Sequence, residues 1–513
     1  MQSKIMKIAP PPGCSPARSS SRLPVLGALL VALASPTAPA QSIRRIVSDN
    51  GDPIRDPCFL TEYDGKLFFR CNNLDRGNNV ELWAFDGTVA RMAAEIKPGP
   101  TGSDPFDLAV YNGTLYFCAD NGSGLKLWQY RATGGASVAP GSGALAMLPQ
   151  AMFAYAGKLY FRATRFSDIG IELWSFDGTS QTPIDLFPGS GSSYPQHFIE
   201  FNGKLFFNAC GTVNQGTELW CTNGTGKPTE AARIYPNNGS SPENFAVFNG
   251  QLYFSAYDGV HGRELWRYDG TTATLAADIV PGGQYSSSNP SGLTVFDGKL
   301  YFCATDEVHG YELWSFDGTT AAMVAEINPT PDPGDGDTFL MDASPNSLTV
   351  FDGQLYFSAI DGSHGRELWA YDGTTVRLVR DINPGPYGSE VAELTVFDGA
   401  LYFRADDGYS PGLANMEPAV FAMVAAPKPT LVLAVRPTPG GGFVLVVSNS
   451  DGSPATAAQL AAVQILRSED LTLPVEQWQP WSGPRVLTNG VIEIQPAPTA
   501  GVLRCFYRAA INP

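Results

Sequence analysis

The feature that most constrains this chain is a tripeptide, Glu-Leu-Trp, that returns at almost constant spacing. Its tryptophan, or that of the variant Lys-Leu-Trp, stands at Trp83, Trp128, Trp174, Trp220, Trp266, Trp314 and Trp369, with gaps of 45, 46, 46, 46, 48 and 55 residues. Such a period is typical of one supersecondary unit repeated many times. A second motif, Gly-x-Leu-(Tyr/Phe)-Phe, marks the same period eight times, from Gly65 to Gly399. The sequence therefore predicts eight units, of which the eighth lacks its Glu-Leu-Trp.

Each unit is predicted to form four short strands, because apolar residues alternate within it and Asp-Gly or Asn-Gly pairs separate the runs. In the unit that begins at Ser291, we expect strands over 293–296, 299–304, 312–316 and 322–327. Four antiparallel strands at this period are typical of a β-propeller blade, since a small sheet can bury its faces only against neighbouring sheets. The aromatic residues that recur in every unit are accordingly expected to pack between blades rather than to bind a ligand.

The units resemble the ELWxxDGT repeat, which is written here as 264–271, 312–319 and 367–374. The resemblance covers most of the chain. Unit two departs from it, with Lys126 in place of glutamate and no Asp-Gly pair, and unit four has Asn-Gly at 223–224. The resemblance implies a secreted bacterial protein with propeller-like repeats, and it implies no particular chemistry.

The two ends of the repeat region indicate how the ring closes. Unit eight offers three strands and then stops, whereas Ile43–Asp49 looks like the fourth-strand segment 379–385 of unit seven. An N-terminal strand that completes the last blade would remove an unpaired sheet edge. We therefore expect an all-β fold with an eight-bladed β-propeller closed by an N-terminal strand, the alternative being seven blades if unit eight does not fold.

Three regions are predicted: a signal peptide over 1–40, the propeller over 41–424, and a small all-β domain of sandwich type over 425–513. Basic residues precede an apolar run at 23–34, and Ala38-Pro-Ala40 supplies a site for signal peptidase, which indicates cleavage near Ala40 and a secreted or cell-surface protein, periplasmic or extracellular. No later segment has the length of a transmembrane helix. The mature chain would carry 29 basic and 50 acidic residues, which disfavours nucleic acid as a partner.

Cysteine positions predict one disulfide and suggest a second. Cys58 and Cys71 are equally distant from the Asp64-Gly65 turn, so an unbroken hairpin would place them opposite one another. Cys210 and Cys221 lie at the two ends of a hairpin in unit four and are the second candidate pair. Export to an oxidising compartment would favour such bonds.

No catalytic residue is predicted. His261, His309 and His364 share one repeated loop, Asp-(Gly/Glu)-x-His-Gly, which indicates a structural role for each, and the fourth histidine, His197, has no recognisable nucleophile as a partner. The glutamate of Glu-Leu-Trp recurs in six units, which favours a structural hydrogen bond or an edge charge over a general acid.

Binding is predicted on the face that carries the longer loops, because loops on a rigid scaffold concentrate functional residues. The insertion that lengthens the last repeat holds Asp332, Asp335, Asp337 and Asp342, and it is the best single candidate. Its carboxylates are close enough in sequence to bind Ca²⁺, although a solvated acidic loop is the alternative and the sequence predicts no other cofactor.

Two classes of function fit this sequence. The first is an exported, non-catalytic binding or adhesion protein that engages an extracellular protein or polysaccharide. The second is an exported propeller enzyme, either a carbohydrate-active hydrolase or lyase or a quinone-dependent dehydrogenase. Against the quinone enzyme, the chain has no adjacent pair of cysteines.

Overall fold

The structure of the protein, a computed structural model, describes residues 42–424 except 52–53, 74–78, 142–146, 166–168, 190, 213–215, 237, 330–341 and 409–417, together with the strands of the C-terminal part. The chain divides into two compact units, of which one spans Ser42–Ala425. The described residues form strands, turns and loops and no helix, so none of them forms an apolar helix of membrane-spanning length.

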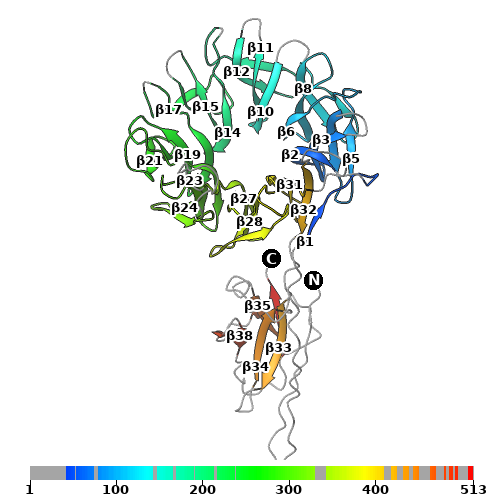
Figure 1. The fold of residues 1–513 in the computed structure, drawn as a ribbon, viewed down its shortest axis with the longest axis vertical. Coiled ribbons are helices and arrows are strands. Elements are labelled where there is room, and N and C mark those ends of the chain that lie inside the picture. The colour runs from blue at the N-terminus through cyan, green and yellow to red at the C-terminus, as the bar shows by residue number, and fades with distance from the viewer. Residues whose placement is uncertain are drawn as a thin grey trace, which may run out of the picture. The chain divides into compact units, whose positions relative to one another are not determined.

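Eight four-stranded antiparallel sheets form the first unit and follow one another around a ring (Figure 1). Blades 1 to 4 are β2(Arg55–Tyr63)-β3(Lys66–Asn73)-β4(Asn79–Phe85)-β5(Ala90–Ala94), β6(Phe106–Tyr111)-β7(Thr114–Asp120)-β8(Leu125–Arg131)-β9(Gly135–Val138), β10(Met147–Tyr155)-β11(Lys158–Arg165)-β12(Ile169–Phe176)-β13(Gln181–Ile184) and β14(Gln196–Phe201)-β15(Lys204–Cys210)-β16(Thr217–Thr222)-β17(Thr229–Ala232). Blades 5 to 8 are β18(Glu243–Phe248)-β19(Gln251–Tyr257)-β20(Arg263–Tyr268)-β21(Ala273–Ala277), β22(Ser291–Phe296)-β23(Lys299–Thr305)-β24(Tyr311–Phe316)-β25(Ala321–Ala325), β26(Asn346–Phe351)-β27(Gln354–Ile360)-β28(Arg366–Tyr371)-β29(Val376–Arg380) and β30(Ala392–Phe397)-β31(Ala400–Ala405)-β32(Ala419–Val424)-β1(Ser42–Arg45). The predicted eight-bladed β-propeller is confirmed.

The first strand of each blade is the innermost one, and the first strands of neighbouring blades contact one another around the centre of the ring (Figure 1). Because consecutive strands are antiparallel, the two tight turns of each blade share one face of the ring, here called the hairpin face. The loops between the second and third strands share the other face with the connections between blades. We call this second face the loop face.

The ring closes as the sequence predicts. In blade 8, β1 pairs with β32 in an antiparallel register that runs from Ser42 opposite Val424 to Arg45 opposite Phe421. The backbone N–H of Ile46 then donates to the carbonyl of Val420 at 2.9 Å. The N-terminal strand thus supplies the fourth strand of the last blade and covers the edge of β32 that would otherwise be unpaired.

The core consists of apolar side chains packed between adjacent blades. In one cluster, Phe248 and Leu265 of blade 5 pack against Leu300, Phe302 and Trp314 of blade 6. The leucine and the last phenylalanine of the Gly-x-Leu-(Tyr/Phe)-Phe motif are fully buried in all eight blades. Burial of one such side chain contributes about 1.5–3 kcal/mol, so the repeated aromatic residues stabilise the contacts between blades, as predicted.

The second unit contains two small antiparallel sheets. The first has the order β33(Leu431–Pro437)-β34(Phe443–Asn449)-β38(Val491–Ile494)-β37(Arg485–Thr488), and the second has the order β36(Gln479–Pro480)-β35(Val463–Ser468)-β39(Phe506–Ile511). This all-β architecture agrees with the expectation for 425–513. The expected signal peptide, 1–40, lies outside the described residues.

Candidate ligand site in the central channel

Every inner strand is interrupted by a β-bulge at the same place. In each blade the register between the first and second strands shifts at this point. Two residues three positions apart there have a positive φ, and the second of them lies five residues before the first turn of the blade. A bulge bends the strand and re-aims its side chains and N–H groups, and it is often found next to functional sites.

The second left-handed residue differs from blade to blade, although the backbone is repeated. From blade 1 to blade 8 these residues are Phe59, Asp107, Ala151, His197, Asn244, Gly292, Ser347 and Glu393, which we call the bulge ring. At the bulge ring, the backbone repeats from blade to blade, but the side chains do not. The eightfold symmetry of the repeat is therefore broken at this position. Binding of one ligand by a ring of like units requires such a departure.

Three members of the bulge ring join neighbouring blades through hydrogen bonds, here called latches. A side-chain oxygen of one member accepts a hydrogen bond from the backbone N–H of the next member. Oδ2 of Asp107 accepts from Ala151 at 3.1 Å, Oδ1 of Asn244 accepts from Gly292 at 3.4 Å, and Oε2 of Glu393 accepts from Phe59 at 2.8 Å. The left-handed backbone therefore presents N–H donors to oxygen acceptors on the preceding blade.

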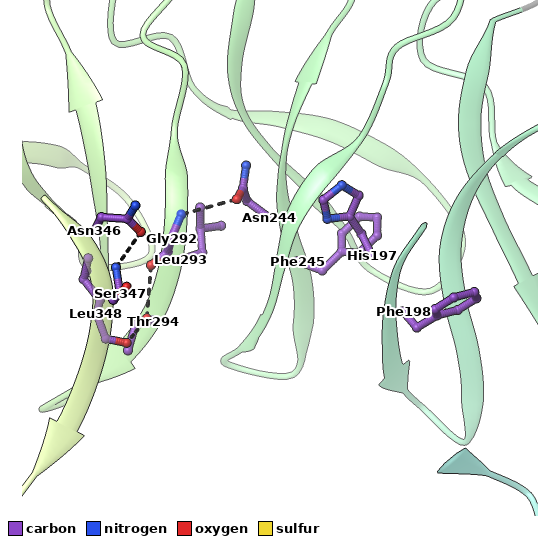
Figure 2. Close-up of a pocket in the computed structure, with 10 residues that line it drawn as sticks. All are labelled: His197, Phe198, Asn244, Phe245, Gly292, Leu293, Thr294, Asn346, Ser347 and Leu348. Carbon is purple, nitrogen blue, oxygen red and sulfur yellow. Dashed lines mark hydrogen bonds between the residues drawn. The ribbon is translucent and has the colours of Figure 1, made fainter. Parts of the chain in front are cut away.

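A cavity of about 390 Å³ opens among the inner strands β14, β18, β22 and β26 of blades 4 to 7. Figure 2 shows its lining, which consists of His197, Phe198, Asn244, Phe245, Gly292, Leu293, Thr294, Asn346, Ser347 and Leu348. Four members of the bulge ring are among these residues. The lining combines an imidazole, two carboxamides, two hydroxyl groups and two aromatic rings, and it contains no carboxylate.

His197 is the titratable group of this cavity. Its ring lies edge to face with the ring of Phe245, at a centroid distance of 6.4 Å and an angle of 89°. The surrounding protein removes part of its hydration and so lowers the pKa of His197, the charge of Glu243 opposes this, and the guanidinium groups of Arg162 and Arg263 lower the pKa further. The imidazole is therefore neutral at neutral pH and has a lone pair available to accept a proton.

The three loop histidines have the structural role that the sequence predicts. Nδ1 of His261, His309 and His364 lies 2.6, 2.7 and 2.6 Å from a carboxylate oxygen of the aspartate three residues earlier in the same loop. This hydrogen bond raises the pKa of each of these histidines. Each histidine thus braces its own loop, on the loop face of blades 5, 6 and 7.

The repeated glutamate also has a structural role, as expected. Glu81, Glu172, Glu218, Glu264, Glu312 and Glu367 are at most 1% exposed, and each accepts hydrogen bonds from backbone N–H groups of the connection to the next blade. Five of them also accept a hydrogen bond from a buried serine at 2.5–2.6 Å, and at Glu312 the equivalent residue is Ala343. Burial raises the pKa of these carboxyl groups, to about 7 at Glu312.

Most of the acidic insertion lies outside the described residues, which include Asp342 but not Asp332, Asp335 and Asp337. Oδ1 of Asp342 accepts a hydrogen bond from the backbone N–H of Tyr311 at 2.8 Å, so this carboxylate ties the connection to blade 6. Within the described part of the chain, no three His, Cys, Asp or Glu side chains are grouped so that they could hold a metal ion. The expectation of Ca²⁺ at the insertion stays a prediction.

The predicted disulfide pairs are not formed. The thiols of Cys58, Cys71, Cys210 and Cys221 are free, as are the other cysteines that the structure describes. The reason for the first pair is the bulge: the register shift between Thr61 and Cys58 places Cys58 opposite Arg70, whereas an unbroken hairpin would place it opposite Cys71. In blade 4, Cys210 stands opposite Thr217 and Cys221 opposite Phe206, which separates them along the strands.

The sequence around His197 did not indicate that this histidine belongs to a site. The signal that was missed is the residue pair Xaa-Pro that precedes or opens seven of the inner strands, as in Tyr194-Pro195 and Ser241-Pro242. Its first residue has a positive φ and starts the bulge. Counting five residues back from each first turn would have identified the bulge ring, although not the cavity.

Comparisons with known proteins support the fold. No protein-family model and no curated protein matches the chain. Among solved structures it is similar to a puromycin hydrolase (13% identity, TM-score 0.43, 78% of this chain and 59% of that one) and to a Mycobacterium tuberculosis puromycin-hydrolyzing peptidase (10%, 0.43, 72% and 62%). It is also similar to the β-propeller domain of the Trilobed protease from Pyrococcus furiosus (13%, 0.39, 64% and 98%). The chain thus spans about three fifths of the length of the two puromycin-cleaving proteins.

These comparisons correct one expectation. We expected a non-catalytic binding or adhesion protein, whereas the similar structures are named as a puromycin hydrolase, a puromycin-hydrolyzing peptidase and the propeller domain of a protease, so this expectation is not retained. At identities of 10–13% and TM-scores of 0.39–0.43, they assign no activity to this chain. The substrate must therefore be argued from the cavity of this chain.

Proposed function

We propose that this chain is an exported enzyme that binds an acidic polysaccharide in its central channel and cleaves it by elimination. The observation that supports this proposal is the combination of groups in the cavity of blades 4 to 7. There, a neutral imidazole stands beside aromatic rings, carboxamides and hydroxyl groups, at positions where the blades differ from one another.

The lining suits a sugar ring. Phe245 supplies apolar surface beside His197, and Asn244, Asn346 and Thr294 supply donors and acceptors for hydroxyl groups. Sites for small polar ligands are generally concave, of about 300–1,000 Å³, and join apolar surface to a few polar groups. The cavity of about 390 Å³ lies within this range.

The chemistry of the lining favours elimination over hydrolysis. Glycoside hydrolysis commonly uses two carboxyl groups on either side of the scissile bond, and no carboxylate is among the residues that line the cavity. Elimination from a sugar acid needs one base close to the carbon that carries the carboxylate. His197 can supply that base, because its lowered pKa leaves the imidazole unprotonated at neutral pH.

In this reaction, a nitrogen of His197 takes the proton from the carbon next to the sugar carboxylate. The electron pair of that C–H bond forms a carbon–carbon double bond with the neighbouring ring carbon, and the glycosidic C–O bond on that neighbour breaks. The leaving oxygen takes up a proton from water, and the imidazolium returns its proton to solvent. One chain end carries the double bond and the other carries the new hydroxyl group.

The test is a screen of the purified chain against pectate, alginate, a glucuronan and neutral polysaccharides, with ultraviolet absorbance of the unsaturated product and reducing ends as readouts. The proposal predicts unsaturated product from at least one acidic polysaccharide, and loss of at least about a hundredfold in kcat for His197→Gln. His364→Gln is the matched control, because His364 lies outside the cavity, and it should retain activity. Turnover with no unsaturated product, or an active His197→Gln variant, would exclude elimination by His197.

A further inference from the structure

The bulge ring contains a gap on the wall of the cavity, between blades 6 and 7. Gly292 occupies the position from which Asp107, Asn244 and Glu393 latch the next blade, and it has no side chain with which to do so. Gly292 and the residue that a latch would reach, Ser347, both line the cavity (Figure 2).

The backbone N–H of Ser347, which a latch from position 292 would reach, is bonded to a residue of its own blade instead. The backbone N–H of Ser347 donates to Oδ1 of Asn346 in its own blade at 2.6 Å, and Asn346 is exposed. An exposed side chain that is bonded to the neighbouring backbone can turn away when another acceptor arrives. The donor is therefore available to a ligand at the cost of one local hydrogen bond.

The protein itself indicates which acceptor suits this kind of donor. In two of the three latches the acceptor is a carboxylate oxygen, from Asp107 and from Glu393. A carboxylate accepts N–H bonds more strongly than a neutral oxygen does, because the bond is assisted by charge.

The charge around the gap is compatible with an anion. Arg366, on the third strand of blade 7, donates through Nη1 to the carbonyl of Ser344 at 3.0 Å and to Oγ of Ser358 at 3.3 Å. Burial lowers the pKa of Arg366, the negative charge of Glu390 opposes this effect, and the guanidinium stays protonated at neutral pH. Arg162 and Arg263 act on the opposite side of the cavity, at His197.

There is also room for a ligand group at Gly292. A Cβ placed on Gly292 would lie 3.6 Å from Cδ1 of Leu348, which is an ordinary contact, so the position is open. Its φ of +67° is a conformation that glycine and asparagine tolerate well. The same position in blade 5 is Asn244, with a φ of +58° and a latch.

We propose that Gly292 is a specificity-determining residue: the gap that it leaves between blades 6 and 7 admits the carboxylate of a sugar acid, which accepts the N–H of Ser347 as Asp107 and Glu393 accept their neighbours' N–H groups. This inference rests on the proposed function and deepens it: the carboxylate at the gap belongs to a neighbouring sugar residue of the same polysaccharide chain, and holding it positions the residue from which His197 takes the proton. His197 and the gap lie on opposite parts of one cavity, so a single substrate can reach both.

The test uses Gly292→Asn, which should add a fourth latch and fill the gap while keeping the left-handed backbone. Two matched variants accompany it. Gly292→Ala adds a methyl group and no acceptor. Phe59→Asn places asparagine at the same register in blade 1, where neither residue 59 nor the next member of the bulge ring, Asp107, lines the cavity. Thermal melting of each variant establishes that it folds.

The probes are a trimer of galacturonic acid and its methyl ester, with binding measured by calorimetry. We expect the wild-type protein to bind the acid at least about tenfold more tightly than the ester, and Gly292→Asn to weaken binding of the acid by at least about tenfold, or about 1.4 kcal/mol. Phe59→Asn should change the affinity by less than about twofold. Gly292→Ala should be weakened less than Gly292→Asn.

The outcomes distinguish this inference from the function on which it rests. Equal binding of acid and ester, or a folded Gly292→Asn that binds the acid as tightly as wild type does, overturns the carboxylate subsite and leaves a saccharide enzyme in place. If the galacturonate trimer does not bind, trimers from alginate and from a glucuronan replace it. Failure of all three to bind, together with no unsaturated product in the screen, overturns both.

Discussion

The buried glutamates of blades 5 and 6 differ in one partner, so the contribution of that partner to stability can be measured by exchanging it. In blade 5, Oγ of Ser288 donates to Oε2 of Glu264 at 2.5 Å, whereas in blade 6 the corresponding residue beside Glu312 is Ala343. The backbone is the same at both places, because the carbonyl of each residue accepts a similar N–H bond, at 3.0 Å for Ser288 and 2.9 Å for Ala343. The reciprocal variants Ser288→Ala and Ala343→Ser therefore exchange one hydroxyl donor.

The magnitude follows from the pKa of Glu312, which burial raises from the ordinary 4.5 to about 7. Burial favours the protonated carboxyl group of Glu312. Its contribution to the free energy of unfolding is therefore present in full below pH 4.5 and is lost as pH rises through about 7. At pH 8, keeping this carboxylate ionised in the folded protein costs on the order of 3 kcal/mol relative to the unfolded chain. A hydroxyl that donates to a charged group recovers about 1.5–3 kcal/mol.

Ala343→Ser should therefore lower the pKa of Glu312 and raise the free energy of unfolding by about 1.5 kcal/mol at pH 8, with a smaller gain at pH 5. Ser288→Ala should raise the pKa of Glu264 and destabilise the propeller by about 1.5–3 kcal/mol at pH 8, again with a smaller effect at pH 5. Urea unfolding at the two pH values, followed by tryptophan fluorescence, measures both. Equal effects at pH 5 and pH 8, or a destabilising Ala343→Ser, would refute this reasoning.

Three further predictions concern titration, the contacts between blades and ring closure. By NMR, the three histidines of the Asp-(Gly/Glu)-x-His-Gly loops should have pKa values above 6.5 and His197 a pKa below it. The contribution of the loop histidines to stability is therefore present below pH 6.5 and is lost as pH rises through their folded-state pKa values. The reverse order of pKa values would contradict the hydrogen bonds assigned to them. Tyr111→Phe removes a 2.7 Å hydrogen bond from the hydroxyl to the carbonyl of Gly157 in the next blade and should cost about 1 kcal/mol in urea unfolding, with no loss meaning that water replaces the bond fully. Deletion of 42–48 removes β1 and should lower the melting temperature and the cooperativity of unfolding, whereas an unchanged melting curve would show that closure by β1 is dispensable.

The regular part of this molecule could be predicted from sequence because the information is local and is repeated eight times. A turn pair with positive φ, such as Asp297-Gly298, fixes each hairpin, and alternation fixes which side chains face the next blade. Closure by Ile43–Asp49 could be recognised because the segment resembles a fourth strand and one fourth strand was missing. Both inferences used residues whose conformation follows from their neighbours in sequence.

The bulges account for what the sequence analysis missed. The Cys58–Cys71 pairing assumed an unbroken hairpin, and the bulge at Phe59, which has a positive φ, shifts the register between the turn and Cys58. His197 and Gly292 are 95 positions apart and line one cavity only because the ring brings four inner strands together. A spatial relation of this kind depends on the closed ring and is not present in any single repeat.

The most direct test of the central claim is a crystal structure of the His197→Gln variant soaked with an acidic oligosaccharide that the wild-type protein cleaves. We expect electron density for the oligosaccharide among β14, β18, β22 and β26, with a ring carbon of one sugar next to residue 197 and a carboxylate at Gly292 and Ser347. Density on the loop face or the hairpin face, with the channel empty, would contradict it.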